Sequence, residues 1–283
     1  MTLGDGRTLA WRDYGQDDGR PVLWFQGTPG SRYSRHADES VYDRFHVRFL
    51  LFDRPGFGAS SRLPDRGVAV VADDAAELLD HLGLASVHVG GGSGGGAHVL
   101  AVAACHPERV VAATVVAGGS PYEEEADLDG LIDLNRDAWH AAQEGWEALY
   151  AFSAPVREQI LADPLAGFRS IMDSAPARDQ TVIEDPAWQR VFIESMTEAL
   201  RPGVEGWVDE QMALLPPWDF DPTAVRCSLT WWHGEHDANA PIAAVRRLLD
   251  RMGGQVDLRV WKEAGHLEFH HQYDLILEEL LAR

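Results

Sequence analysis

Residues 86–98 read Ser-Val-His-Val-Gly-Gly-Gly-Ser-Gly-Gly-Gly-Ala-His, and this stretch decides the fold. A short β-branched run enters a block of glycines with one serine, Ser93, at its centre, and the segment Ala97–His106 reads as a helix. A strand that turns this sharply into a helix strains the backbone at the turn, and side chains beside the turn would collide with the strand and the helix. The first turn of such a helix also directs free N–H groups at the site, where they stabilise an anion.

Two motifs compete for this glycine block. The segment Gly91–Gly95 fits Gly-x-Ser-x-Gly, the nucleophile elbow, whereas Gly90–Gly95 fits the dinucleotide-binding pattern G-x-G-x-x-G. The dinucleotide motif usually lies in the first βαβ unit and has a carboxylate about 20 positions later, at the end of the next strand. Here the next predicted strand, Val110–Ala117, ends in Gly-Gly-Ser without a carboxylate. The block favours the elbow, while a dinucleotide turn and an ordinary tight turn stay open.

Composition and charge limit the class of protein. The chain has 283 residues, of which 45% are hydrophobic and 24% charged, as expected for one large α/β domain. Its net charge of −21 repels nucleic acid and anionic membranes, so we expect neither as a partner.

The number of cysteines and the length of the apolar runs indicate the cellular compartment and whether a metal site is expected. Only Cys105 and Cys227 occur, and neither has the spacing of a metal site, so we expect no metal and no disulfide framework. The first six residues lack the basic start and apolar core of a signal peptide, and no apolar run approaches 18 residues. These features predict a cytoplasmic protein.

Apolar runs alternate with helical patterns along most of the chain. This alternation is typical of a mostly parallel central sheet with helices on both faces, the α/β class. Besides the run before the glycine block, the predicted strands are Thr8–Tyr14, Pro21–Gln26, Val47–Asp53, Val110–Ala117, Cys227–His233 and Asp257–Trp261. The predicted core helices are Val68–Leu82, Ala97–His106, Pro241–Arg251 and His271–Ala282.

The alternation stops between Pro121 and Pro222. We expect helices there, separated by prolines that include Pro155: Asp127–Glu144, Gly145–Phe152, Val156–Ala162, Pro186–Leu200 and Val204–Leu215. We predict that residues 121–222 form a helical cap over the carboxyl ends of the strands, where ligands of α/β proteins bind. Residues 1–120 and 223–283 then form the core. The alternative is a helical flank with no role in the site.

Three polar residues follow successive predicted strands in the order that a serine nucleophile needs. A serine hydroxyl needs a base to remove its proton, and the base needs a carboxylate to orient it. Ser93 follows the elbow strand, Asp237 follows Cys227–His233, and His266 follows Asp257–Trp261. Competing acids and bases lie nearby: Glu235, His236, His270 and His271.

Acyl transfer also needs two N–H donors for the developing oxyanion. One is expected from Gly94, directly after the nucleophile, and the other from the loop after Pro21–Gln26. Pro29 has no N–H, so Thr28 is the expected second donor, and Gly27 lets the backbone approach closely. An ordinary glycine-proline turn is the alternative for this loop.

Taken together, these motifs resemble the α/β-hydrolase fold superfamily over nearly the whole chain. The resemblance implies a catalytic triad of Ser93, Asp237 and His266, with Gln26, Gly27, Gly91 and Gly95 in supporting positions. Gln26 departs from the histidine that the family usually has, but a glutamine can still hydrogen-bond, so we expect the oxyanion loop to be kept. The segments that carry the resemblance are Gln26–Gly30, Asp53–Ser60, Val89–Gly96, Trp232–Asp237 and Gly265–His266.

The resemblance implies a serine hydrolase that acts on a small carboxylic ester or lactone through an acyl-enzyme, without a cofactor. Four tryptophans of the helical segment are candidates to line the pocket or to form the core of the cap: Trp139, Trp146, Trp188 and Trp207. C–C bond hydrolysis, peptidase activity, lyase or cyclase chemistry on the same fold, a non-catalytic small-molecule receptor and a nucleotide-dependent enzyme are the alternatives. The oligomeric state, including a homo-oligomer, stays open.

Overall fold

The predicted apolar runs form one seven-stranded sheet within residues 1–253 and 256–283, the part of the chain that this computed structural model describes. The strand order is β1-β3-β2-β4-β5-β6-β7, and β1 pairs antiparallel with β3 while the other neighbours pair in parallel. The strands are β1 (Trp11–Gly15), β2 (Arg20–Phe25), β3 (Val47–Phe52), β4 (Val87–Gly92), β5 (Val110–Val116), β6 (Ser228–Gly234) and β7 (Val256–Trp261). The strand predictions are confirmed with small differences at the ends.

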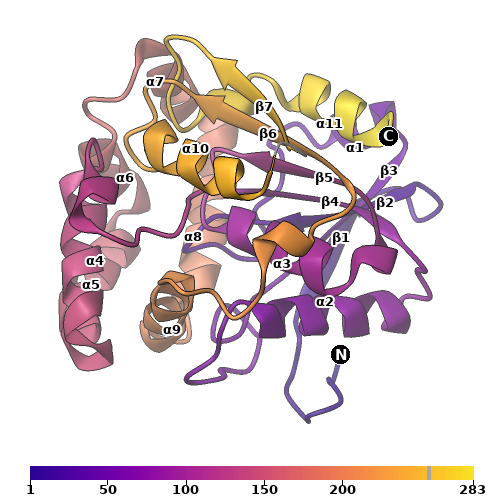
Figure 1. Cartoon of the computed structure of the whole chain (residues 1–283), viewed down its shortest axis with the longest axis horizontal. Coiled ribbons are helices and arrows are strands. Elements are labelled where there is room, and N and C mark those ends of the chain that lie inside the picture. The colour runs from indigo at the N-terminus through magenta and orange to yellow at the C-terminus, as the bar shows by residue number, and fades with distance from the viewer. Residues whose placement is uncertain (254–255) are drawn as a thin grey trace.

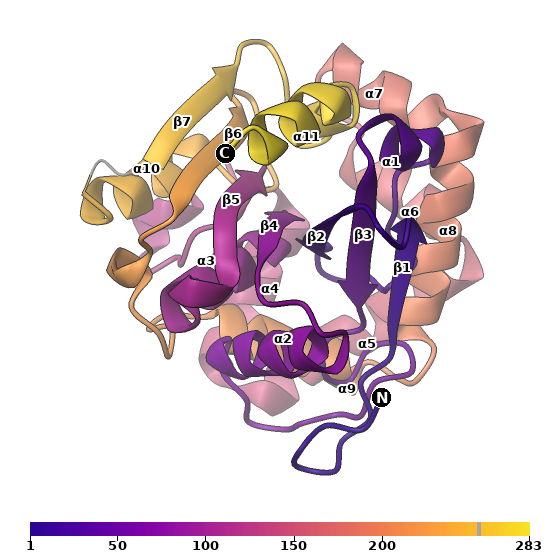
Figure 2. The same ribbon diagram turned by 90° about the vertical axis from the view of Figure 1, so that its right-hand side faces the viewer.

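Helices cover both faces of this sheet, as Figures 1 and 2 show. Helices α2 (Ala69–His81), α3 (Gly95–Cys105) and α10 (Ile242–Arg251) pack their apolar side chains into one core on one face. Helices α1 (Ser40–Arg44) and α11 (Tyr273–Leu281) pack into a second core on the other face. Strand β4 is central in the sheet and buried along its whole length, so the turn that follows it is supported from both sides.

Between β5 and β6 the chain forms a helical segment with its own apolar core. In Figure 1 these helices lie together beside the sheet. They are α4 (Asp133–Glu144), α5 (Trp146–Ala162), α6 (Pro164–Ile171), α7 (Ala177–Glu184), α8 (Pro186–Leu200) and α9 (Glu205–Leu214). Short 3₁₀ turns lie at Pro107–Arg109, Glu125–Leu128, Pro222–Ala224 and Glu268–His270.

The break expected at Pro155 is wrong, because α5 runs through this proline as one helix. A proline inside a helix costs about 3 kcal/mol through its missing N–H and its clash with the preceding turn. Side chains on both sides of it, Tyr150 and Phe152 before and Ile160 after, pack against the same apolar core. This shared burial offsets the cost and lets one helix continue through the proline.

Helices α6 and α7 were not predicted. The side chain of Asp163 accepts hydrogen bonds from the N–H groups of Leu165 and Ala166, and Pro164 occupies the first helical position of α6. An aspartate before a proline is a common helix start, so the sequence does carry a local signal for α6. Helix α7 begins after Pro176 without a side-chain cap and carries no comparable signal.

Candidate active site

Ser93 lies in a strained turn between β4 and α3. Its φ angle is +53°, in the left-handed region that costs a non-glycine residue on the order of 1–3 kcal/mol. The Ser93 N–H donates to the Val116 carbonyl (3.1 Å), and the Ser93 carbonyl accepts from the N–H groups of Gly96 (3.0 Å) and Gly119 (3.3 Å). Strand β5 and the start of α3 therefore hold the backbone in this conformation and lift the serine out of the turn.

The glycines around Ser93 give clearance for β2. A Cβ atom at Gly95 would lie 2.2 Å from the Phe25 carbonyl oxygen, and one at Gly91 would lie 2.9 Å from the same oxygen. Both positions therefore exclude any side chain. The close approach of β2 therefore explains why positions 91 and 95 are glycine. No bound phosphate is needed to explain them.

The loop that carries the Thr28 N–H lies against the turn that carries Ser93 and the Gly94 N–H. A Cβ atom at Gly94 would lie 2.5 Å from Thr28 Oγ1, and a Cβ atom at Gly27 would lie 3.3 Å from Ser93 Cβ. Neither N–H donates a hydrogen bond to any acceptor in residues 1–253 and 256–283. Two unengaged donors next to a serine form a site that can stabilise an oxyanion.

Arg54 holds the Thr28 loop from behind. Its fully buried guanidinium donates to the carbonyls of Gln26 (2.7 Å) and Gly27 (3.0 Å) and to Thr28 Oγ1 (2.8 Å). Gln26, which departs from the family pattern, donates from Nε2 to the Phe52 carbonyl (3.0 Å) at the end of β3. The glutamine and the arginine therefore tie this loop to the neighbouring strand.

Glu210 of α9 balances the charge of this arginine. It is fully buried, and its Oε1 lies 2.7 Å from Arg54 Nε, 2.9 Å from His98 Nε2 and 3.1 Å from Thr28 Oγ1, while Oε2 pairs with Arg66. Burial by itself raises the pKa of Glu210, but the charge of Arg54 and its other partners hold it well below the usual range. Burial lowers the pKa of His98 to about 4, so this ring is neutral near pH 7. Sequence reasoning gave no signal for Glu210, Arg66 or His98.

Asp237 and His266 form a hydrogen-bonded pair. Asp237 Oδ2 lies 2.8 Å from His266 Nδ1, and Asp237 Oδ1 accepts from the N–H groups of Asn239 (2.9 Å) and Ala240 (3.0 Å). Burial by itself would lower the pKa of His266, but the charge of Asp237 outweighs it and the net pKa is raised above 6.5. An ionised Asp237 accepts the Nδ1 proton, so the Nε2 atom of a neutral His266 is left as a base.

The competing residues differ from His266 in exposure or in hydrogen bonding. Glu235, His236 and His271 are exposed. His270 accepts a hydrogen bond from the Trp188 indole N–H (3.2 Å), and burial lowers the pKa of His270 to about 3, so it stays neutral.

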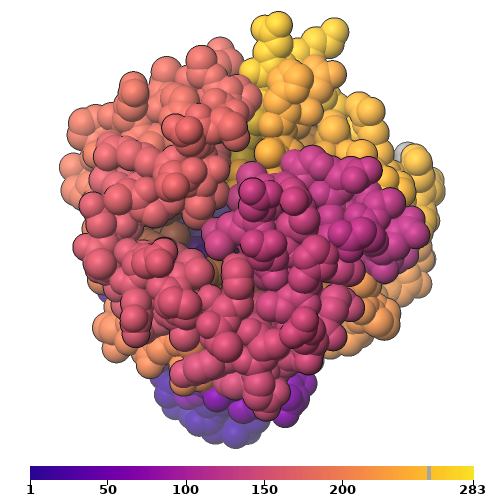
Figure 3. Space-filling view, turned by 90° about the vertical axis from the view of Figure 1, so that its left-hand side faces the viewer, coloured from indigo at the N-terminus to yellow at the C-terminus, as the bar shows by residue number. Residues whose placement is uncertain are grey.

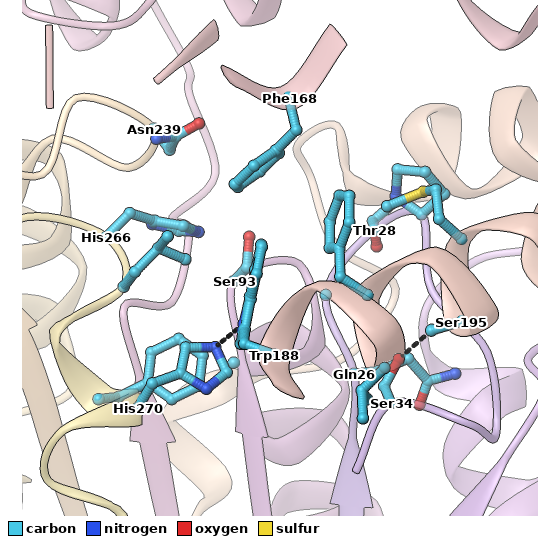
Figure 4. A pocket seen from close by; sticks show the side chains of 18 of the residues that line it. Gln26, Thr28, Ser34, Ser93, Phe168, Trp188, Ser195, Asn239, His266 and His270 are labelled. Atoms are coloured by element: carbon cyan, nitrogen blue, oxygen red, sulfur yellow. Dashed lines mark hydrogen bonds between the residues drawn. The ribbon is translucent and has the colours of Figure 1, made fainter. Parts of the chain in front are cut away.

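A cavity of about 290 Å³ joins these groups and is lined by both Ser93 and His266. Figure 4 shows Phe168 of α6 pointing into it, and Figure 3 shows a hollow between helices of the segment that follows β5. The remaining lining is mostly apolar and includes Ile132, Leu134, Ile160, Ile171, Val191, Phe192, Met196, Trp207 and Leu267. No hydrogen bond joins the Ser93 hydroxyl to His266 in the described part of the chain.

Two of the four candidate tryptophans line this cavity, Trp188 and Trp207. Trp139 donates its indole N–H to the Tyr122 carbonyl (3.2 Å), and Trp146 stacks on Tyr150 within the core of the helical segment. Helical spacing alone does not separate the two groups, because all four positions lie on helices that have an apolar face.

Residues 1–253 and 256–283 contain neither a metal-type cluster nor a membrane-spanning helix. No group of three or more His, Cys, Asp or Glu side chains there is arranged to hold a metal ion. Within the same residues, no helix has the length and apolar character needed to span a bilayer.

Known proteins resemble this chain in sequence and in structure. It is 31% identical over 160 residues to a non-heme chloroperoxidase from Streptomyces lividans, which covers 55% of the chain and 58% of that protein. The chain spans less than two thirds of the length of the curated relatives that it matches first.

Solved structures show the same fold along the whole chain. A structure from a study of Nitrososphaera gargenis carboxylesterases covers 100% of this chain and 97% of its own, with a TM-score of 0.70 and 18% identity. The enol-lactonase from Burkholderia xenovorans covers 99% and 98%, with a TM-score of 0.66 and 18% identity. The family model described as the alpha/beta hydrolase fold matches residues 20–170. The chain therefore belongs to the alpha/beta hydrolase fold family.

Proposed function

We propose that this protein is a serine hydrolase that cleaves a small, neutral carboxylic ester or lactone. One observation carries the proposal: Ser93, in a strained turn, and His266, which is hydrogen-bonded to Asp237, line the same cavity together with Thr28. A base, a nucleophile and two oxyanion donors are what acyl transfer needs.

In the proposed reaction, His266 Nε2 removes the Ser93 proton and the serine oxygen attacks the carbonyl carbon. The Thr28 and Gly94 N–H groups hold the oxyanion, and Asp237 stabilises the imidazolium that forms. His266 then protonates the leaving oxygen as the acyl-enzyme forms. Water, deprotonated by His266, attacks that acyl group and releases the acid, which returns Ser93 to its starting state.

The lining of the cavity supports a neutral, largely apolar substrate. Arg35 is the cationic side chain that lines it within the described residues, and its guanidinium is paired with Glu39 (2.7 Å) and Glu194 (2.7 Å). A substrate carboxylate would therefore meet no free cation there, whereas an aliphatic or aromatic group would be buried against Phe168, Trp188 and their neighbours. The names of the carboxylesterase and lactonase structures agree with this substrate class.

We also propose that residues 121–222 act as a cap that sets the shape of this pocket. Helices α5, α6 and α8 contribute Ile160, Phe168 and Trp188 to its lining, while Ser93 and His266 come from loops of the sheet. The choice of substrate then depends mainly on the helical segment, and the chemistry depends on the core.

The purified protein should hydrolyse neutral p-nitrophenyl esters and simple lactones. We expect kcat/KM to rise from acetate to butyrate or hexanoate, because the added methylenes are buried against apolar side chains. A matched monoester of a dicarboxylic acid, which carries a free carboxylate, should be a poorer substrate by tenfold or more, roughly the effect of 1.4 kcal/mol. Absence of turnover on every ester and lactone would contradict the proposal, and a preference for the anionic ester would contradict the substrate class.

The acid limb of the kcat/KM profile should have its midpoint above pH 6.5. Only neutral His266 can accept the serine proton, so activity is lost as the pH falls through the raised pKa of this residue. Replacing Asp237 by Asn should lower kcat by about 10⁴ and move any remaining limb to lower pH. Rates measured in constant-ionic-strength buffers check this, and a wild-type midpoint below 6.5 would be inconsistent with the Asp237–His266 pair.

A further inference from the structure

Asp179 contacts the backbone on both sides of His266. This residue of α7 is completely buried, its Oδ1 accepts from the Gly265 N–H (3.1 Å), and its Oδ2 accepts from the Leu267 N–H (2.9 Å). The two carboxylate oxygens therefore satisfy the two N–H groups that bracket the histidine.

The loop fits closely against this carboxylate. A Cβ atom at Gly265 would lie 2.6 Å from Asp179 Oδ2, so only glycine allows the contact. The next residue toward the N-terminus, Arg178, adds a two-pronged ion pair with the buried Glu268, with its Nε 2.6 Å from Oε2. Two adjacent residues of α7, Arg178 and Asp179, therefore bond residues 265–268, the histidine loop. Helix α7 belongs to the helical segment and not to the sheet.

We propose that Asp179 is a positioning residue for the reaction, which orients His266 through the Gly265 and Leu267 N–H groups and brings a second carboxylate against the histidine loop. This inference rests on the proposed function and deepens it. It makes the docking of α7 a condition for an active histidine, since a shift of the helix would release both hydrogen bonds. The carboxylate does not touch the substrate, so its effect on the rate acts through His266.

Several charged and titratable groups face His266, and their roles are separable. Asp237 from the loop after β6 bonds Nδ1, His233 of β6 lies 3.4 Å from the same carboxylate, and His270 lies in the following 3₁₀ turn. Burial lowers the pKa values of His233 and His270, so both are neutral near pH 7. Asp237 and Asp179 both raise the pKa of His266 against the opposing effect of burial, and burial raises the pKa of Asp179 itself.

Two substitutions of Asp179 separate its effect on the position of His266 from the effect of its charge. Asp179→Asn keeps one oxygen and can accept a hydrogen bond from one of the two N–H groups, whereas Asp179→Ala can accept neither hydrogen bond. We therefore expect kcat to fall about tenfold in Asp179→Asn and about 10² in Asp179→Ala, with KM changed less. Both remove the same charge, so both should move the acid limb of kcat/KM to lower pH by a similar amount. Asp173→Asn, which removes an exposed carboxylate before α7, is the matched control and should leave the rate and limb unchanged.

NMR of the wild type and of Asp179→Asn gives an independent readout that needs no turnover. The His266 ring should titrate at lower pH in the variant, and the wild-type Gly265 and Leu267 amides should exchange slowly with solvent. Folded variants with wild-type kcat, acid limb and His266 titration would overturn the inference. Should Asp179→Asn not fold, fast exchange of both amides in the wild type would overturn it. An inactive wild type in which His266 still titrates lower on substitution would refute the proposed function and leave the positioning role standing.

Discussion

The Ser93→Ala protein should fold as the wild type does and lose ester hydrolysis by a factor on the order of 10⁶ in kcat. The expected loss is this large because the serine oxygen forms the covalent bond, and neither His266 nor the free N–H groups can replace it. Alanine keeps the Cβ atom and the backbone hydrogen bonds of the turn, which involve only the Ser93 N–H and carbonyl. Thermal unfolding and kcat on the best ester of the panel measure the two effects separately.

Ser195→Ala is the matched control, because it removes a hydroxyl from the same cavity. Ser195 Oγ bonds the Ser31 N–H (3.1 Å) and lies 2.5 Å from Ser34 Oγ, so its loss should cost some stability but less than tenfold in kcat. A Ser93→Ala protein that retains more than about one thousandth of the wild-type kcat would argue for a different nucleophile.

Removing Glu210 should produce the largest loss of stability. In Glu210→Ala, the buried guanidinium groups of Arg54 and Arg66 lose the carboxylate that pairs with both, and an uncompensated buried charge costs about 3–5 kcal/mol. Arg54 also holds the carbonyls of Gln26 and Gly27, so the loop that carries the Thr28 N–H should shift and kcat should fall. Urea unfolding measures the free energy, and rates measured below the transition measure the effect on the loop.

Glu158→Ala, at an exposed glutamate of α5, is the control and should change the free energy of unfolding by less than about 0.5 kcal/mol. Glu210→Gln should fall between the control and Glu210→Ala, because the amide keeps the shape and one acceptor but not the charge. Equal urea midpoints for Glu210→Ala and the wild type would contradict this prediction, because they would mean that Arg54 and Arg66 do not depend on Glu210 for charge balance.

The sheet and the elbow could be predicted from the sequence because their signals are local. A strand buried on both faces, such as β2 or β4, appears as an unbroken apolar or glycine-rich run, and a turn at φ +53° needs small neighbours. The path of α5 through Pro155 could not be predicted, since the burial that offsets the proline comes from other helices. The family membership and the fold are confirmed, while the catalytic roles and the cap boundaries stay predictions.

Asp179 and Glu210 show why part of the candidate site was missed. Both are acidic residues on helices, a carboxylate is usually exposed to solvent, and nothing in their neighbouring residues marks them as buried. Their partners, the Gly265 and Leu267 N–H groups in one case and Arg54 and Arg66 in the other, lie far away in the sequence. Such contacts depend on how the helical segment docks on the sheet, which no local pattern encodes.

Reaction with a fluorophosphonate probe tests most directly whether Ser93 is an activated nucleophile. The probe forms a stable phosphonyl ester with a serine whose proton is taken by a positioned base, so it reports on Ser93 and His266 without the natural substrate. We predict one adduct per chain by intact mass, located on the peptide that contains Ser93, and no adduct in Ser93→Ala. A wild-type protein that stays unlabelled, or a Ser93→Ala protein that is labelled as well as the wild type, would contradict the account.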